Sequence, residues 1–171
     1  MPSTLALADV PFNENSMPDA SIKLRPYRPG DAEAFRLLNE AWIEKYFGIE
    51  EADQKVLHDP DGYILARGGH IFFATSCGAP IGCCALIPIE PGAYEVAKMA
   101  VAEPFQGRGI GRRVLAYTIE QARALGANRL YLETNSRLAN AIHLYTSLGF
   151  QQLPPRPTPY VRANVFMEMC L

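Results

Sequence analysis

The residues of this chain best suited to chemistry form a glycine-rich loop, Gln106 to Arg113, between an apolar segment and a patterned helix. Three glycines alternate along the loop and let a large anion approach its backbone: Gly107, Gly109 and Gly111. Backbone N–H groups at the start of a helix already attract anions. Three arginines add positive charge at the same place: Arg108, Arg112 and Arg113. The loop therefore predicts a binding site for a pyrophosphate group.

Two common phosphate-binding loops do not fit these residues. A Walker A loop requires Gly-Lys-Ser or Gly-Lys-Thr after its second glycine, and that tripeptide does not follow here. A dinucleotide fingerprint, G-x-G-x-x-G, counted from Gly107 would place its third glycine where Arg112 stands. That fingerprint also belongs early in a βαβ unit, whereas this loop lies past the middle of the chain. The pattern that remains is Q-x-x-G-x-G, from Gln106 to Gly111, after a hydrophobic strand.

This pattern resembles motif A of the GNAT superfamily, the acetyl-CoA-dependent N-acyltransferases. A second segment is similar to motif B of that family, in which a helix with a tyrosine runs into Gly-Phe. Here it extends from Ala141 through Tyr145 to Phe150. The resemblance implies acetyl-CoA as co-substrate, with the coenzyme A pyrophosphate on the loop amides. It also implies a primary amine as acceptor, attacking directly in a ternary complex, and no metal.

One position departs from the family pattern. Family members often carry an asparagine seven residues before the motif B tyrosine, where it touches the cofactor arm, and this chain has Leu138 there. Asparagines stand instead at Asn135 and Asn140. The cofactor-binding residues that the resemblance implies are Met99, Ala100, Val101, Gln106, Gly107, Arg108, Gly109, Ile110, Gly111, Arg112, Asn135 and Asn140.

Attack of an amine on a thioester needs a neutral amine, a stabilised carbonyl oxygen and a stabilised thiolate. The resemblance implies Glu95 as the base, because it lies eleven residues before Gln106, like the catalytic glutamate of the family's histone-acetylating members. Strand alternation predicts that Glu95 shares a face with Met99 and Val101, and that Lys98 points the other way. A glutamate ion-paired on a solvated strand, with water as the base, is the alternative.

Tyr145 and the strand before the loop are the candidates to stabilise the thiolate and the carbonyl oxygen. The resemblance places Tyr145 beside the sulfur, as a hydrogen-bond donor and general acid. A buried tyrosine with a purely structural role is the alternative. Backbone N–H groups around Met99 to Val101 are the expected donors to the thioester oxygen.

Periodicity and turn residues outline the elements that must position these groups. Strands are predicted near 22–27, 70–75, 81–88, 93–101, 129–134, 150–153 and 164–170. Helices are predicted from Asp31 and Glu50 and over 109–125 and 139–148, with a turn at 59–62. The fold class is α/β (α+β), a mixed and mostly antiparallel sheet of six to seven strands with about four helices. The resemblance implies a sheet splayed between its fourth and fifth strands, with the pantetheine arm in the gap.

Length, charge and cysteine content limit the domain organisation, the partners and the location that we expect. With 171 residues we expect a flexible extension over 1–20 and one GNAT-like domain over 21–171. A net charge of −2 and a pI near 5.9 favour neither nucleic acid nor an anionic membrane. Apolar runs are far shorter than the ~20 residues of a membrane span. Four cysteines without Cys-x-x-Cys spacing indicate no metal site and a reducing cytoplasm. A homodimer is compatible with the resemblance.

The residues that would bind the amine acceptor say less about its identity than the loop says about the cofactor. In the resembling fold the acceptor enters beside the first two helices and the last hairpin, where this chain offers Trp42, Tyr46, Phe47, Tyr160 and Arg162. These aromatic residues could hold a small or apolar amine, or could belong to the core. The acceptor therefore stays open between a small molecule and a peptide or protein amine. A non-catalytic or weakly catalytic acetyl-CoA sensor or interaction module is the alternative function.

Overall fold

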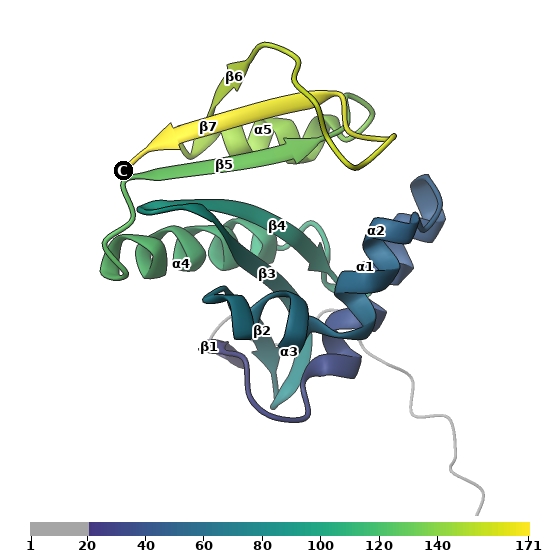
Figure 1. Ribbon diagram of the computed structural model, residues 1–171. Coiled ribbons are helices and arrows are strands. Elements are labelled where there is room, and N and C mark those ends of the chain that lie inside the picture. Colours follow the sequence, from purple (N-terminus) through teal and green to yellow (C-terminus); the bar gives the residue numbers. More distant parts are fainter. Residues whose placement is uncertain (1–20) are drawn as a thin grey trace, which may run out of the picture.

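The computed structural model describes residues 21–171; the predicted extension over 1–20 lies outside the described residues. One sheet with helices on both faces makes up the described chain (Figure 1). The strands are β1 (Ile22–Pro26), β2 (His70–Ser76), β3 (Ala79–Glu90), β4 (Ala93–Val101), β5 (Arg129–Thr134), β6 (Gln151–Leu153) and β7 (Val165–Cys170). The α-helices are α1 (Ala32–Tyr46), α2 (Glu51–His58), α3 (Pro60–Tyr63), α4 (Ile110–Ala124) and α5 (Ala139–Ser147). Within this part of the chain no helix is both long and apolar enough to cross a membrane.

The seven strands lie in the order β1-β2-β3-β4-β5-β7-β6. Every neighbouring pair is antiparallel except β4 and β5, which run parallel because α4 connects them as a crossover. The predicted mixed, mostly antiparallel fold is therefore confirmed.

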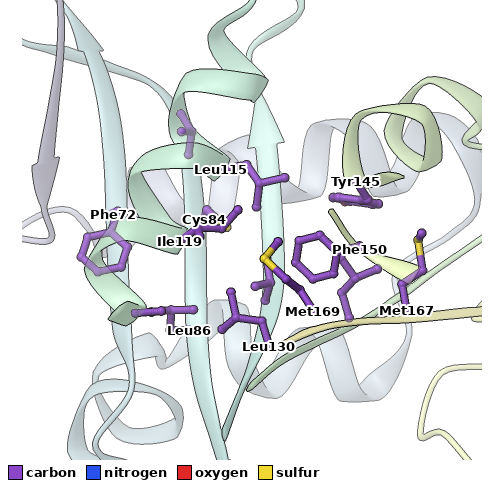
Figure 2. Close-up of a cluster of buried hydrophobic side chains, with 14 of the residues drawn as sticks. Phe72, Cys84, Leu86, Leu115, Ile119, Leu130, Tyr145, Phe150, Met167 and Met169 are labelled. Carbon is purple, nitrogen blue, oxygen red and sulfur yellow. The ribbon is translucent and has the colours of Figure 1, made fainter. Parts of the chain in front are cut away.

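A separate apolar core fills each side of the sheet. On one side α1 and α2 bury Phe35, Ile43 and Leu57 against Phe73 and Ala85 of the sheet. On the other side α4 and α5 cover a larger cluster that runs from Phe72 to Met169, and Figure 2 shows Tyr145 and Phe150 inside it. Each face of β4 therefore meets a different set of helices.

The parallel pairing of β4 and β5 is short. It joins Ala93 to Arg129, Tyr94 to Leu130 and Glu95 to Tyr131, and it extends no further in the described chain. Beyond Glu95 the two strands diverge toward their C-terminal ends (Figure 1). This is the splay that the resemblance implied. It leaves the edge of β4 from residue 96 onward without a strand partner on the β5 side.

A β-bulge interrupts β4 just after this point. Ala97 pairs with Ala85 and Ala100 with Cys83, so two residues of β4, Lys98 and Met99, stand opposite a single residue of β3. Lys98 takes a left-handed backbone conformation, with φ of +52°. Such an extra residue exchanges the two faces of a strand from the bulge onward.

The bulge makes the predicted alternation wrong. Glu95 lies opposite Ile87, which packs on the α1–α2 core, and the side chain of Lys98 reaches Asp53 of α2. Met99 and Val101 instead pack on the α4–α5 core. Lys98 therefore lies on the same side of the sheet as Glu95, and Met99 and Val101 lie on the other side.

A one-turn helix, α3, replaces the turn predicted at 59–62. Proline at its first position needs no N–H partner, and the Asp59 carboxylate accepts a hydrogen bond from the Gly62 N–H at 2.9 Å. The N–H of Tyr63 and the N–H of Ile64 then donate to the carbonyls four residues earlier. The sequence indicates the turn residues but not their continuation as a helical turn.

Candidate active site

A pocket of about 480 Å³ lies where β4 and β5 diverge. Its volume falls in the range typical of small-molecule sites. Eight of the predicted site residues line it: Glu95, Met99, Ala100, Val101, Gln106, Asn135, Asn140 and Tyr145. The other predicted site residues, 107–112, form the loop that continues from Gln106 into α4. Predicted cofactor residues and both predicted catalytic residues, Glu95 and Tyr145, therefore line one pocket.

The loop has the backbone geometry that an anion site needs. Gly107 and Gly109 both have φ of +74°, a left-handed conformation that strains any other residue. Gly109 is the N-cap of α4, and no side chain caps the helix. The first N–H groups of α4 therefore have no intrahelical acceptor and no cap. Ile110 anchors this turn and is only 2% exposed.

The charges at this helix start are the reverse of the usual preference. Helix N-termini carry partial positive charge and favour acidic residues, yet the first turn of α4 has none. Arg112 stands there, and its guanidinium donates to the Ser147 hydroxyl of α5 at 2.6 Å. The guanidinium of Arg108 lies 5.6 Å from the centre of the Phe105 ring. A bound polyanion such as pyrophosphate would offset this positive charge.

Two predicted cofactor residues make contacts within the protein. The Gln106 side chain donates to the carbonyl of Val101 at 2.9 Å and so closes the end of β4. The Asn135 amide donates to the carbonyl of Arg162 at 2.6 Å and accepts from the N–H of Arg137 at 2.8 Å. Asn135 therefore ties the loop after β5 to the segment before β7. Asn140 lines the pocket from the first turn of α5.

The pKa of the Glu95 carboxyl is raised toward neutral pH. Burial raises its pKa, the nearby carboxylate of Glu133 raises it further, and the ammonium of Lys98 lowers it; the result is a pKa of about 7. Glu133 lines the same pocket and accepts hydrogen bonds from the hydroxyls of Tyr131 and Thr158. Glu95 can thus exchange a proton near physiological pH.

The phenol of Tyr145 stays protonated. Its side chain is buried beside Phe150, with the two ring centres 6.0 Å apart. Burial, and to a smaller extent Cys84, raises the pKa of Tyr145 above its ordinary value. Tyr145 therefore offers the pocket an O–H donor at every physiological pH.

Behind Glu95 lies a buried ionic cluster made by Lys98, Asp53 and Arg162. Lys98 Nζ lies 2.7 Å from Asp53 Oδ1, and Arg162 Nη2 donates to the same oxygen at 2.7 Å. The Arg162 guanidinium also meets Glu50 at 3.1 Å. Burial acts to raise the pKa of Asp53, but the hydrogen bond from Arg162 and the charge of Lys98 outweigh it and lower this pKa to about 2. The cluster joins α2, the bulge of β4 and the segment before β7.

Sequence reasoning missed three of these pocket residues: Lys98, Glu133 and Arg137. Glu133 carried a usable signal, since it lies at the end of the strand next to Glu95. Lys98 was assigned to the wrong face because the bulge has no sequence signature. The aromatic residues proposed for the acceptor side, Trp42, Tyr46, Phe47 and Tyr160, all line the pocket.

Comparison with known proteins agrees with this geometry. The family model for the acetyltransferase (GNAT) family matches residues 32–150, more than half of the chain. The chain belongs to the GNAT family. Both motifs on which the resemblance was based lie within the matched region.

Individual relatives of this GNAT chain are distant. It is 31% identical over 94 residues to the uncharacterized N-acetyltransferase YjgM of Escherichia coli (strain K12), covering 53% of this chain and 56% of YjgM. Its fold is similar to that of a GNAT-family acetyltransferase from Staphylococcus aureus Mu50, with a TM-score of 0.76 at 21% identity over 87% of this chain and 98% of the other. A GNAT acetyltransferase from Elizabethkingia anophelis with acetyl-CoA bound has a TM-score of 0.61 at 24% identity, over 88% and 99% of the chains.

Sequence matches to the first curated relatives are partial. The match spans 56%, 19% and 63% of the lengths of the first three. The structural matches below 25% identity show the fold alone.

We predict that Asp53→Asn destabilises the protein by about 3 kcal/mol, because it leaves the charge of Lys98 buried without its partner and removes one of the two carboxylates that pair with Arg162. Since the folded-state pKa of Asp53 is lowered, its contribution is complete above its ordinary pKa of 3.8 and is lost as the pH falls toward about 2. Urea unfolding at pH 7 and at stepwise lower pH measures both effects.

The matched control is Glu51→Gln, which removes an exposed ion pair with Lys55 from the same helix. We expect it to leave the unfolding midpoint unchanged. Equal stability of Asp53→Asn and the wild type at pH 7 would show that the cluster does not hold the site together.

Proposed function

We propose that this chain transfers the acetyl group of acetyl-CoA to a primary amine by direct attack in a ternary complex. The observation that carries the proposal is the pocket at the β4–β5 split, which holds a carboxyl with a pKa of about 7 and is lined at one end by Gln106, from which the chain continues into an uncapped, glycine-rich helix start. The helix start suits the pyrophosphate of coenzyme A, and the carboxyl suits proton removal from an amine.

Acetyl-CoA supplies the activated acyl group as a thioester. The loop over Gly107 to Arg112 would hold its pyrophosphate, and the open edge of β4 beyond Glu95 would accept its pantetheine arm by backbone pairing. A Cβ placed on Gly107 or Gly109 would meet no atom within 4 Å, so there is open space beside the backbone of the loop.

Glu95 would take the proton of the attacking amine as the new N–C bond forms. An ordinary glutamate and a primary amine differ by about six pKa units, which makes the transfer strongly uphill. With the pKa of Glu95 at about 7 the difference falls to roughly three units. Removing the ammonium form of the amine from water lowers the pKa of the amine, which makes the difference between the two pKa values smaller still.

The end of β4 and Tyr145 would stabilise the negative charges that develop on the carbonyl oxygen and on the sulfur. Backbone N–H groups of β4 around Met99 to Val101 would stabilise the negative charge that develops on the carbonyl oxygen. As the C–S bond breaks, the departing sulfur would accept a hydrogen bond from the Tyr145 hydroxyl, which lines the same pocket. Because burial raises the pKa of Tyr145, full proton transfer to a thiolate of ordinary pKa is uphill by more than about 2 kcal/mol. Tyr145 therefore acts as a hydrogen-bond donor to the sulfur rather than as a strong acid.

The proposed location is the cytoplasm, because all four cysteines are free, with Cys83 and Cys84 buried.

Thiol release from acetyl-CoA with a panel of amines, amino acids and peptides tests the function. We expect acetyl-CoA to raise the thermal midpoint and at least one amine to release coenzyme A in step with its acetylation. Stabilisation by acetyl-CoA without turnover on any amine would instead support the sensor function. No stabilisation at all would contradict both.

We predict that Glu95→Gln lowers kcat by about 100-fold or more and removes the rise in rate around pH 7. The wild-type rate should increase as Glu95 loses its proton, because only the carboxylate can accept the amine proton. A pH–rate profile from pH 5 to 9 for both proteins measures this. Glu44→Gln, an exposed change on α1, is the charge control and should keep the wild-type profile. An unchanged profile in Glu95→Gln would remove Glu95 from the mechanism.

A further inference from the structure

Arg137 is a pocket-lining cation that the proposed acetyl transfer does not use. It lies in the loop between β5 and α5, is exposed, and places its guanidinium 5.1 Å from the centre of the Phe47 ring at the end of α1. Within residues 21–171 no carboxylate forms an ion pair with it. Its charge is therefore available to a ligand.

The other two cations of the pocket are already neutralised. Lys98 pairs with Asp53, and Arg162 pairs with both Asp53 and Glu50. Their side chains are nearly buried, at 5% and 14% exposure. An anionic group that enters the pocket therefore meets one uncompensated guanidinium, that of Arg137.

Arg137 lies away from the pyrophosphate loop. The loop meets the far end of α5, where Arg112 donates to Ser147. Arg137 lies two residues before the first residue of α5. A nine-residue helix is about 13 Å long, so the two positive regions serve different parts of the pocket. A ligand for Arg137 would therefore belong to the acceptor rather than to the pyrophosphate.

A carboxylate, opposite in charge to Arg137, lies a short distance before it in the chain. Glu133 is four residues before Arg137, and its charge acts on Glu95. Four residues span at most about 14 Å even when extended, and Glu133, Glu95 and Arg137 all line the same pocket of about 480 Å³. An amine beside Glu95 and Glu133 and an anionic group on Arg137 would thus fit in one small molecule.

The pocket that holds these charges also has aromatic walls. Trp42 and Phe47 pack edge to face with ring centres 6.4 Å apart, and Tyr46 and Tyr160 also line the pocket. Aromatic walls favour apolar or aromatic groups, and a guanidinium stacked on such a ring presents its N–H fork to a carboxylate.

From these observations we infer that the acceptor is a small amine that also carries a carboxylate and an apolar side chain, with Arg137 binding the carboxylate. This inference rests on the proposed function and specifies its acceptor. Arg137 then determines specificity, Glu95 receives the proton of the amine, and the aromatic wall holds the side chain.

The test compares L-phenylalanine with 2-phenylethylamine, which lacks only the carboxylate. Values of kcat/KM are measured at saturating acetyl-CoA for the wild type, for Arg137→Gln and for Arg123→Gln. The last variant removes an exposed arginine of α4 that pairs with Glu120 outside the pocket. Comparing each variant with the wild type cancels the different basicity of the two amines.

We expect Arg137→Gln to lower kcat/KM for L-phenylalanine by about tenfold to a hundredfold, because it loses a charge-assisted pair. The value for 2-phenylethylamine and the KM for acetyl-CoA should stay unchanged, and Arg123→Gln should match the wild type throughout. Equal losses on both amines, or no loss on either, would overturn the inference while acetylation of 2-phenylethylamine upheld the proposed function.

Binding of N-acetyl-L-phenylalanine in the presence of coenzyme A, measured by titration calorimetry, gives a readout that needs no turnover. We expect binding to the wild type and at least about tenfold weaker binding to Arg137→Gln. Arg137-dependent binding without acetylation of any amine would contradict the proposed function and leave the carboxylate site standing. Absence of both binding and acetylation with these compounds would overturn the inference.

Discussion

Parallel pairing between β4 and β5 holds for only three residue pairs, and the site depends on where it stops. Up to Glu95 the two strands form a continuous sheet, and beyond it the edge of β4 has no strand partner on the β5 side in the described chain. Backbone N–H groups are obligatory hydrogen-bond donors, so an open edge inside a pocket is a place for a ligand that can pair with it. The same cavity is lined by Glu95, Tyr145 and Gln106, the residue from which the glycine loop begins.

The bulge at Lys98 fixes how β4 presents its side chains to that cavity. Lys98 has a left-handed backbone, and its side chain forms a salt bridge with Asp53, which also pairs with Arg162. A buried pair of this kind adds little net stability against an apolar alternative but is costly to break. Here it sets geometry: it joins α2 and the segment before β7 to the strand that carries Glu95, and the charge of Lys98 moderates the raised pKa of that glutamate.

Much of the architecture could be predicted because it depends on local patterns. Glycine and arginine spacing around Gly109 predicts an anion site at the start of α4, and hydrophobic periodicity placed every strand of the sheet close to its observed range. The face of Lys98 could not be predicted, because a bulge arises from the pairing of β4 with β3 and leaves no mark in composition. The contacts of Asn135 with Arg137 and Arg162 likewise require the fold, since Arg162 is 27 residues away in the chain.

Amide hydrogen exchange with and without acetyl-CoA tests the central claim most directly, because it reports on the backbone itself. The account predicts slower exchange on binding in two segments: residues 96–101 at the open edge of β4, and residues 107–112 at the start of α4. Unchanged exchange in both segments, with acetyl-CoA bound and protection confined to other parts of the chain, would contradict the assignment of the β4–β5 split as the cofactor site.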